Sequence, residues 1–364
     1  MNLYDKSNIS DINISNNKIE YLKNLTKNGL EFYIDNCYAQ IVIMECDWIY
    51  FPLVICDYVE GQTYLTSLIS SYIDYPKQML NNQIFSFGLS ILKKILRFGN
   101  FDKVIYINHW LISTNVQYSF SDEQIDKITR YLKDKFPNHA LIFGNIAKER
   151  NEIIFKSLKK NNYKFLINRR SYFIDKYNFD IVYKKSSLRK DIHIYKKGKY
   201  KFSYDNKLWE KHAELYRSLY IEKYTKLNPM YNNNFFELCS NLFDFKNLLD
   251  NKNNIVGICF PIIFENTVVV PCLGYDRTFD LKEGLYRLLI LDVINYAKQH
   301  NCSINLSSGV GDFKQKRGAK PYWEYLVIDY SHLNIFRRIL YFLFIEITNK
   351  ISFYLLKTTN TKLF

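Results

Sequence analysis

A single glycine, Gly284, stands where a strand-like pattern gives way to a helical one. Residues 267–276 read as a strand, a polar loop follows, and apolar residues then recur at helical spacing from Leu285. Glycine lets a ligand approach the backbone because it has no Cβ, and the first N–H groups of a helix attract phosphate. We therefore interpret the N–H groups of Leu285, Tyr286 and Arg287 as a candidate pyrophosphate site. The alternative is an ordinary turn from strand to helix.

A second glycine-containing turn follows the next expected strand. The segment Ser307–Ala319 reads SSGVGDFKQKRGA, with Gly309 and Gly311 after the strand and Asp312 placed to cap a short helix. Ligands of α/β sheets commonly bind where neighbouring strands diverge at their C-terminal ends. Three cations lie beside the turn: Lys314, Lys316 and Arg317. Two such turns on successive strands predict a slot for a phosphorylated ligand. The alternative is a tight turn followed by a solvated basic helix, which would have the same sequence pattern.

A third group of polar residues, INHWLISTN, lies in the first half of the chain just after an expected strand. Its His109 and Trp110 are candidate substrate contacts, and His109 is also a candidate base. The alternative is that both are packed structural residues. The sequence contains no HExxH, GxSxG, Walker A or GxGxxG motif, so zincin, esterase, nucleoside triphosphatase and dinucleotide-binding functions lack support.

The composition predicts a globular protein of two domains. The chain has 364 residues, of which 48% are hydrophobic, and a formal net charge of +14. A positive field favours phosphates, acidic carrier proteins, nucleic acid or anionic lipid, whereas scattered solvated lysines would carry no such meaning. The seven cysteines show no CxxC spacing and lie mostly in apolar runs. They indicate buried free thiols in a reducing compartment, without a zinc site. With no signal peptide visible, we predict a cytoplasmic protein.

Both halves of the chain alternate strand-like and helix-like segments, which favours an α/β fold. Residues 103–108 read as a buried strand, and Ser121 with Gln124 forms a capping box for the helix that follows. The two halves could be versions of one fold. We predict five parts: a polar lead-in (1–25), an N-terminal domain (26–182), a basic connector (183–203), a C-terminal domain that is the better candidate for catalysis (204–335), and a basic amphipathic helix (336–364).

Four segments of the second half carry a resemblance to a known family: LYRSLYIEKYTKLNPMY, CLGYD, EGLYRLLILDVINYAKQ and INLSSGVGDFKQKRGAKPYWEYLVI. In this order they resemble the GNAT superfamily of N-acetyltransferases, most closely the tandem-domain, FemAB-like acyltransferases. The first half resembles a diverged copy through VIYINHWLISTN, FPNHALIFGNI and LKKNNYKFLINRRSYFID. The resemblance implies an α/β fold of two tandem GNAT-like domains, each with a mixed central sheet flanked by helices.

The resemblance also implies where a donor would bind. In this superfamily acyl-CoA enters where two central strands diverge, and its pyrophosphate rests on the N-terminus of the helix after the first of them. In this chain that position comprises Lys282, Glu283, Gly284, Leu285, Tyr286 and Arg287, with Gly309 and Gly311 on the neighbouring turn. The implied activity is transfer of an acyl group from acyl-CoA, or from an acyl-carrier protein, to an amine without a metal.

Relatives often carry a tyrosine before the lysine of the glycine-turn helix, where its hydroxyl can protonate the leaving thiolate. This chain has Phe313 before Lys314, so we expect another proton donor: Tyr275, Tyr286, Tyr322 or solvent. Asp276 is the candidate base for the amine proton, unless it only caps the turn that follows. The candidate catalytic residues are thus Asp276, Tyr275 and Lys314, and the acceptor is expected near Tyr275 and His109.

Two other functions stay open. The first is a FemAB-like transferase that takes an aminoacyl group from tRNA to a cell-wall precursor, which the net charge of +14 would suit. The second is a GNAT-like binding protein without turnover. Residues 336–356 are a candidate lipid-surface helix for anionic membranes in either case, unless this helix packs on its own domain.

Overall fold

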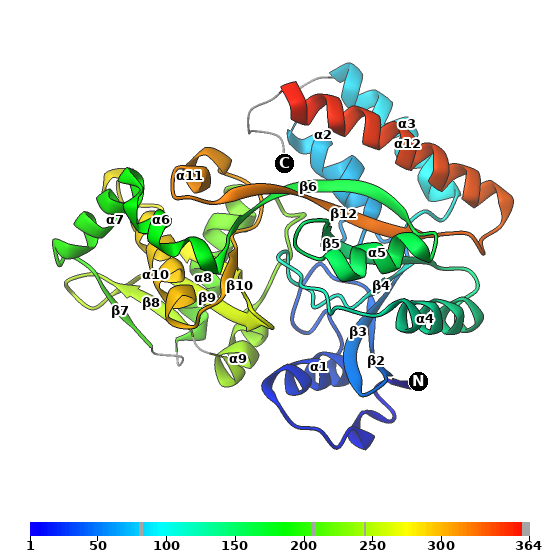
Figure 1. Cartoon of the computed structure of the whole chain (residues 1–364), viewed down its shortest axis with the longest axis horizontal. Helices are drawn as coiled ribbons and strands as arrows, with labels where there is room; N and C mark the ends of the chain where they lie inside the picture. Colours follow the sequence, from blue (N-terminus) through cyan, green and yellow to red (C-terminus); the bar gives the residue numbers. More distant parts are fainter. Residues whose placement is uncertain (80–82, 205–207, 244, 359–364) are drawn as a thin grey trace. The chain divides into compact units, whose positions relative to one another are not determined.

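The computed structural model describes residues 1–79, 83–204, 208–243 and 245–358 (Figure 1). It divides into two compact units. Unit 1 comprises Met1–Arg169, Leu227–Met230 and Trp323–Leu363, and unit 2 comprises Arg170–Lys226 and Tyr231–Tyr322. Each unit is a mixed sheet flanked by helices, as the sequence predicts.

Unit 1 has the strand order β1-β2-β3-β4-β5-β12. All its strand pairs are antiparallel except β4 with β5, which are parallel and joined through α4. The strands are β1 (Asn2–Tyr4), β2 (Gln40–Cys46), β3 (Ile49–Cys56), β4 (Val104–Ile107), β5 (Ala140–Ala147) and β12 (Lys320–Asp329). The helices are α1 (Asn17–Asn28), α2 (Tyr75–Met79), α3 (Gln83–Phe98), α4 (Asp122–Lys135), α5 (Glu152–Lys160) and α12 (Ile335–Thr358).

Unit 2 has the strand order β6-β11-β10-β9-β8-β7. Its strands are β6 (Lys164–Ile174), of which the residues from Arg170 onward belong to this unit, β7 (Lys201–Ser203), β8 (Lys246–Leu249), β9 (Ile255–Phe264), β10 (Thr267–Tyr275) and β11 (Ser303–Asn305). Its helices are α6 (Phe179–Lys184), α7 (Ser186–Lys196), α8 (Trp209–Arg217), which continues as a π-helical turn (Ser218–Glu222), α9 (Asn233–Leu242), α10 (Leu285–Gln299) and α11 (Gly311–Gln315).

The two units repeat one strand pattern. In unit 2, β8, β9 and β10 are antiparallel, β10 leads through α10 to the parallel strand β11, and antiparallel β6 follows. In unit 1, β2, β3 and β4 are antiparallel, β4 leads through α4 to parallel β5, and antiparallel β12 follows. The last strand of each unit extends from the half of the chain that forms the other unit. The prediction that the halves are versions of one fold is therefore consistent with their topology.

This exchange corrects the contiguous domain boundaries expected from the sequence. Residues 183–203, expected as a connector, contain α7 and β7 of unit 2. Residues 1–25, expected as a loose lead-in, contain β1 and most of α1, whose Leu22 and Leu25 are fully buried. The apolar residues of α1 lie three apart in a polar segment, so average composition conceals the stripe that they form. The expected C-terminal helix, residues 336–364, is described as far as Thr358, and it is part of unit 1, because Tyr341 and Phe344 of α12 are buried there.

Several local predictions are confirmed. The Ser121–Gln124 capping box is present at the start of α4, and the strand expected at residues 103–108 is β4. All seven cysteines are free and buried. In the part of the chain that the structure describes, no helix has the length and apolarity needed to cross a membrane.

Gly274 allows α8 to pack directly on β10. A Cβ at this position would lie 2.8 Å from the carbonyl carbon and oxygen of Leu215, and backbone cannot yield as a flexible side chain does. Tyr275, the next residue of β10, faces the opposite side of the sheet, and it pairs with Gly257 of β9. A Cβ at Gly257 would lie 3.3 Å from Leu289 of α10. Helices α8 and α10 therefore cover opposite faces of the sheet.

We expect Gly274→Ala to destabilise the protein by about 1–3 kcal/mol, because the added methyl group overpacks this contact. Urea unfolding followed by circular dichroism measures the effect. Gly144→Ala in β5 is the matched control, since its Cβ would meet only Leu326 at an ordinary 3.5 Å. Equal stability of the two variants would contradict the close-packing role of Gly274.

Candidate functional site

The parallel strands β10 and β11 diverge after a short pairing. Their register runs from Thr267 opposite Ser303 to Val269 opposite Asn305, and β11 ends there. Strand β10 continues to Tyr275 in register with β9 alone, after an irregularity between Val269 and Cys272. Pro271 lies within this irregularity and cannot donate to a ladder. The C-terminal part of β10 thus has one edge not paired with β11, and an open edge at diverging strand ends is the usual ligand position in such sheets.

Helix α10 begins at this end of β10, and its first turn is open. Gly284 has a left-handed φ of +74°, and the first helical hydrogen bond runs 3.0 Å from the Leu288 N–H to the Gly284 carbonyl. The N–H groups of Leu285, Tyr286 and Arg287 are consequently not used inside the helix. No side chain caps this turn, and none of its residues is acidic. The geometry is that of an anion site.

Lys282 and Glu283 lie just before this turn, but they form hydrogen bonds with residues outside it. The Lys282 side chain is exposed, and its backbone N–H donates to Oδ1 of Asp280 over 2.8 Å. The Glu283 carboxylate accepts from the Tyr200 hydroxyl at 3.0 Å and from the Lys199 ammonium at 3.3 Å. These two donors lower the pKa of Glu283 below its ordinary value. Lys199 and Tyr200 thus hold the charge of Glu283 beside the turn.

The equivalent helix of unit 1 is closed to anions. The Ser121 side chain caps the start of α4, and the first turn carries Asp122 and Glu123. Both features oppose phosphate binding, because the cap occupies an N–H group and the carboxylates repel the ligand. Of the two topologically equivalent helix starts, only that of α10 has the chemistry for a phosphorylated donor. This contrast makes the start of α10 the candidate anion site of the two.

Two arginines at this site are held by one buried carboxylate. Asp191 of α7 is fully buried, and its Oδ1 accepts from Nε of Arg287 at 2.6 Å. Arg317 makes a bidentate pair with the same group, from Nε to Oδ2 at 2.6 Å and from Nη2 to Oδ1 at 3.0 Å. Arg317 is itself buried, whereas the Arg287 side chain is 30% exposed. Asp191 therefore fixes one buried and one accessible cation, and the accessible one stands on the first turn of α10.

Aromatic rings line the same region. Tyr286 lies between Tyr275, at a ring distance of 6.1 Å, and Phe313, at 4.9 Å. The Arg317 guanidinium stacks on Phe313 at 3.4 Å from the ring centre. Burial raises the pKa of Tyr286 far above its ordinary value, so this hydroxyl stays protonated at neutral pH. Tyr286 can thus donate a hydrogen bond where Phe313 cannot.

Asp276, the predicted base, caps the turn after β10. Its Oδ1 accepts from the Thr278 N–H at 2.9 Å and from the Thr278 hydroxyl at 2.7 Å. This is the capping role that the sequence left open as an alternative. Within the described residues Oδ2 has no hydrogen-bond partner, so a proton-accepting oxygen remains at the end of β10.

The glycine turn after β11 is strained and held by a lysine. Ser307, Gly309 and Val310 all have positive φ values, of 62°, 72° and 41°, a combination that concentrates at ligand sites. The Lys314 ammonium is buried and donates to the carbonyls of Ser307 at 3.2 Å and Ser308 at 2.5 Å. Lys314, predicted to be catalytic, is placed to fix the turn.

The two glycines of this turn differ in their surroundings. No heavy atom would lie within 4 Å of a Cβ on Gly309, which leaves room for a ligand. At Gly311 the same atom would lie 2.0 Å from the Tyr172 hydroxyl. Gly311 is therefore required by packing against Tyr172, whereas Gly309 remains a candidate contact.

His109 and Trp110 belong to unit 1, whereas the donor-site residues predicted with them belong to unit 2. Trp110 is buried, and its indole N–H donates to Oδ1 of Asn108 over 2.8 Å. Nδ1 of His109 accepts from the Leu111 N–H over 3.2 Å, and burial lowers the pKa of His109 to about 4. Both side chains make hydrogen bonds within the loop after β4, which agrees with the alternative that they are packed structural residues.

Asp191, the residue with the most contacts in the site, is not among the site residues predicted from the sequence. It is the one acid among many cations of residues 183–203, which the sequence predicts as a connector. A lone acid in a basic run is a signal for an internal ion pair, but its partners lie 96 and 126 residues further along the chain. No cluster of His, Cys, Asp or Glu in the described residues could hold a metal ion.

Comparison with solved structures shows the fold. The structure of FemX aligns with 90% of this chain and 92% of its own, with a TM-score of 0.53 and 10% sequence identity. L-PGS from Bacillus licheniformis aligns with 57% of this chain and 73% of its own, at a TM-score of 0.45 and 15% identity. A GCN5-related N-acetyltransferase from Kribbella flavida aligns with 64% of this chain and 82% of its own, at a TM-score of 0.35 and 8% identity.

The FemX alignment spans both units, so the chain has an α/β fold of two units similar to that of FemX. No protein-family model matches the sequence. A search of curated proteins found no similar sequence.

Proposed function

We propose that this chain is an N-acyltransferase that binds its donor in unit 2, where β10 and β11 diverge. The observation that carries the proposal is the open first turn of α10. Three N–H groups, the accessible guanidinium of Arg287 and the absence of an acid in that turn suit a pyrophosphate. The donor is then acyl-CoA, with its thioester directed along the edge of β10 that β11 leaves free.

The reaction at this position is direct aminolysis. The acceptor nitrogen forms a bond to the thioester carbonyl carbon, the C–S bond breaks, and the thiolate leaves. A backbone N–H at the free edge of β10 stabilises the oxyanion. The amine proton passes to Oδ2 of Asp276 or to water, and Tyr275 or water supplies the proton that the thiolate takes. The hydroxyl of Tyr286, whose pKa is raised, donates a hydrogen bond to the leaving sulfur.

A thermal-shift titration with acetyl-CoA, long-chain acyl-CoA and free CoA tests the donor site. A donor that binds the folded chain raises its melting temperature. In Gly284→Glu the new carboxylate repels phosphate and its Cβ would lie 3.3 Å from Ile194, so we expect the donor Kd to rise about tenfold or more.

Gly61→Glu is the matched control. Gly61 also has a positive φ, of 78°, but no heavy atom would lie within 4 Å of its Cβ, and it belongs to unit 1. This variant should keep the wild-type shift. If no CoA compound shifts the melting temperature of the wild type, the CoA proposal is wrong.

A second candidate donor is aminoacyl-tRNA, and the position of α7 favours it. This helix contacts the start of α10 through Ile194 and Asp191, and it carries exposed cations along its length: Arg189, Lys190 and Lys196. A polyanion on α10 could extend over these charges. Such a donor predicts tRNA binding that weakens steeply with salt and competes with CoA. A flat salt response would count against it, and competition by an acidic acyl-carrier protein alone would point to that carrier.

A further inference from the structure

Helix α3 of unit 1 presents its apolar side to solvent. Five residues at helical spacing form one stripe, and each is between 46% and 86% exposed: Ile84, Phe87, Ile91, Ile95 and Phe98. Leu96 is the one buried residue of this helix, and its inner side carries the polar contacts of Lys93 with Asp74 and Glu60. A surface helix normally has the opposite arrangement, so the stripe requires an explanation beyond folding.

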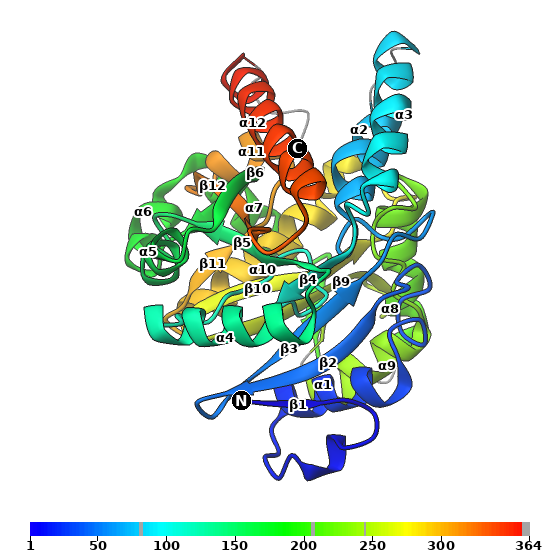
Figure 2. The same cartoon turned by 90° about the vertical axis from the view of Figure 1, so that its right-hand side faces the viewer.

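Helix α12 extends this apolar surface. Its exposed face carries seven apolar side chains, each about half exposed: Ile335, Phe336, Ile339, Phe342, Leu343, Ile347 and Ile351. The two surfaces meet, because Phe98 and Phe336 are in edge contact at 6.0 Å and Gly99 packs against Leu340. Figure 2 shows α3 and α12 projecting from the same side of unit 1. We call this continuous surface the α3–α12 face.

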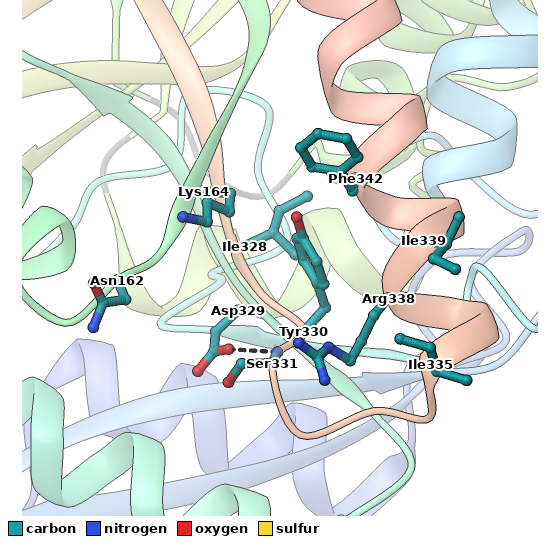
Figure 3. A pocket seen from close by; sticks show the side chains of 10 residues that line it. All are labelled: Asn162, Lys164, Ile328, Asp329, Tyr330, Ser331, Ile335, Arg338, Ile339 and Phe342. Atoms are coloured by element: carbon teal, nitrogen blue, oxygen red, sulfur yellow. Dashed lines mark hydrogen bonds between the residues drawn. The ribbon is translucent and has the colours of Figure 1, made fainter.

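A pocket opens between α12 and the end of β12 (Figure 3). Its volume is about 310 Å³, and its walls combine Ile335, Ile339 and Phe342 with the cations Arg338 and Lys164. The carboxylate in the lining, Asp329, is neutralised by Lys133 at 2.6 Å. No carboxylate of the described residues pairs with Arg338 or Lys164. The pocket thus offers apolar walls and two available cations, which is the chemistry of a phosphate group attached to hydrocarbon.

We propose that the α3–α12 face docks unit 1 onto the headgroup region of an anionic membrane, with a lipid phosphate in the pocket beside Arg338 and Lys164. The charges around the face support this occupant. Lys94, Arg338 and Lys350 are exposed among the apolar residues, and none has a carboxylate partner within the described chain. The exposed acid on α12 is Glu346. Apolar side chains enter the acyl boundary while the cations meet the phosphates.

The charges also argue against a second copy of the chain as the occupant. A two-fold interface places the same patch on both sides, so Lys94, Arg338 and Lys350 would face a surface with the same positive charges. Charged side chains at three exposed positions of α12 also favour a helix that lies in the interface over one that inserts. The proposal is independent of acyl transfer, because it involves no residue of the unit 2 site.

Co-sedimentation of the full chain with vesicles tests the proposal. We expect binding to phosphatidylcholine vesicles that contain phosphatidylglycerol to be at least about tenfold tighter than to phosphatidylcholine alone, and to weaken with salt. The triple variant Ile84→Ser, Phe87→Ser, Ile91→Ser and the double variant Arg338→Glu, Lys350→Glu should each lose about tenfold or more in affinity. The altered side chains are largely exposed, so melting temperatures should stay close to the wild-type value.

The matched control is Ile153→Ser together with Ile181→Ser, which removes two apolar residues that are 61% and 57% exposed on other helices. These changes should leave vesicle binding intact. Absence of binding to anionic vesicles, or equal binding by the triple variant, overturns the proposal. Light scattering tests the alternative that a second copy covers the face. If the wild type is a dimer that does not bind vesicles and the triple variant is a monomer, the face is a dimer interface and the proposal is wrong.

Discussion

Replacing Asp191 with asparagine is expected to remove about 3–5 kcal/mol from the free energy of unfolding of unit 2. The carboxylate is fully buried and receives three charge-assisted hydrogen bonds, from Arg287 and Arg317. Asparagine has nearly the same shape, but it leaves the buried guanidinium of Arg317 without a counter-charge. It also turns an N–H group toward one of the arginine donors, so the loss is electrostatic and no cavity forms. Urea unfolding at neutral pH measures it.

Two further variants separate the stability of the cluster from its role at the donor site. Arg287→Gln keeps the bidentate pair of Asp191 with Arg317, so it should cost less stability than Asp191→Asn while weakening donor binding. Asp180→Asn changes an exposed acid on α6 and should alter neither property. If Asp191→Asn is as stable as the wild type, the two arginines do not depend on this carboxylate.

Local sequence signals predicted the elements that local chemistry determines. The capping box at Ser121 and the apolar run at residues 103–108 each specify their structure within a few residues. Gly284 was identified because a strand and a helix meet there, and its left-handed φ fits a residue without a Cβ. These features need no knowledge of distant partners.

What the sequence did not predict depends on contacts between distant segments. The pairing of β12 with β5 joins residues that are nearly two hundred positions apart, and the partners in β6 and β11, such as Ile174 and Ile304, are 130 apart. Strand register over such distances leaves no local pattern, so the expected domain boundaries were contiguous. The same reason conceals the Asp191 cluster, since the three residues that form it come from α7, from the start of α10 and from just after α11.

The buried histidine of unit 1 leads to the second large effect, on stability in acid. Burial holds the pKa of His109 at about 4, against 6.5 for an ordinary histidine. As pH falls through 6.5 the unfolded chain binds a proton at this residue, whereas the folded chain stays neutral until pH approaches 4. The folded state therefore loses stability over this interval, by about 3 kcal/mol in total at one imidazole. Above pH 6.5 the residue contributes no pH dependence.

His109→Asn removes this titration and keeps an acceptor, because Oδ1 of asparagine can replace Nδ1 as the partner of the Leu111 N–H. The stability of the variant relative to wild type should therefore rise by about 3 kcal/mol between pH 7 and pH 4, measured by urea unfolding at a series of pH values. Asp102 gives the opposite sign, since burial raises the pKa of its carboxyl to about 6. Its contribution is lost as pH rises from 3.8 to 6, so Asp102→Asn should gain relative stability with rising pH. Parallel profiles for His109→Asn and wild type would mean that the folded chain binds a proton at His109 over the same pH range as the unfolded chain, so burial would not lower the pKa of this imidazole.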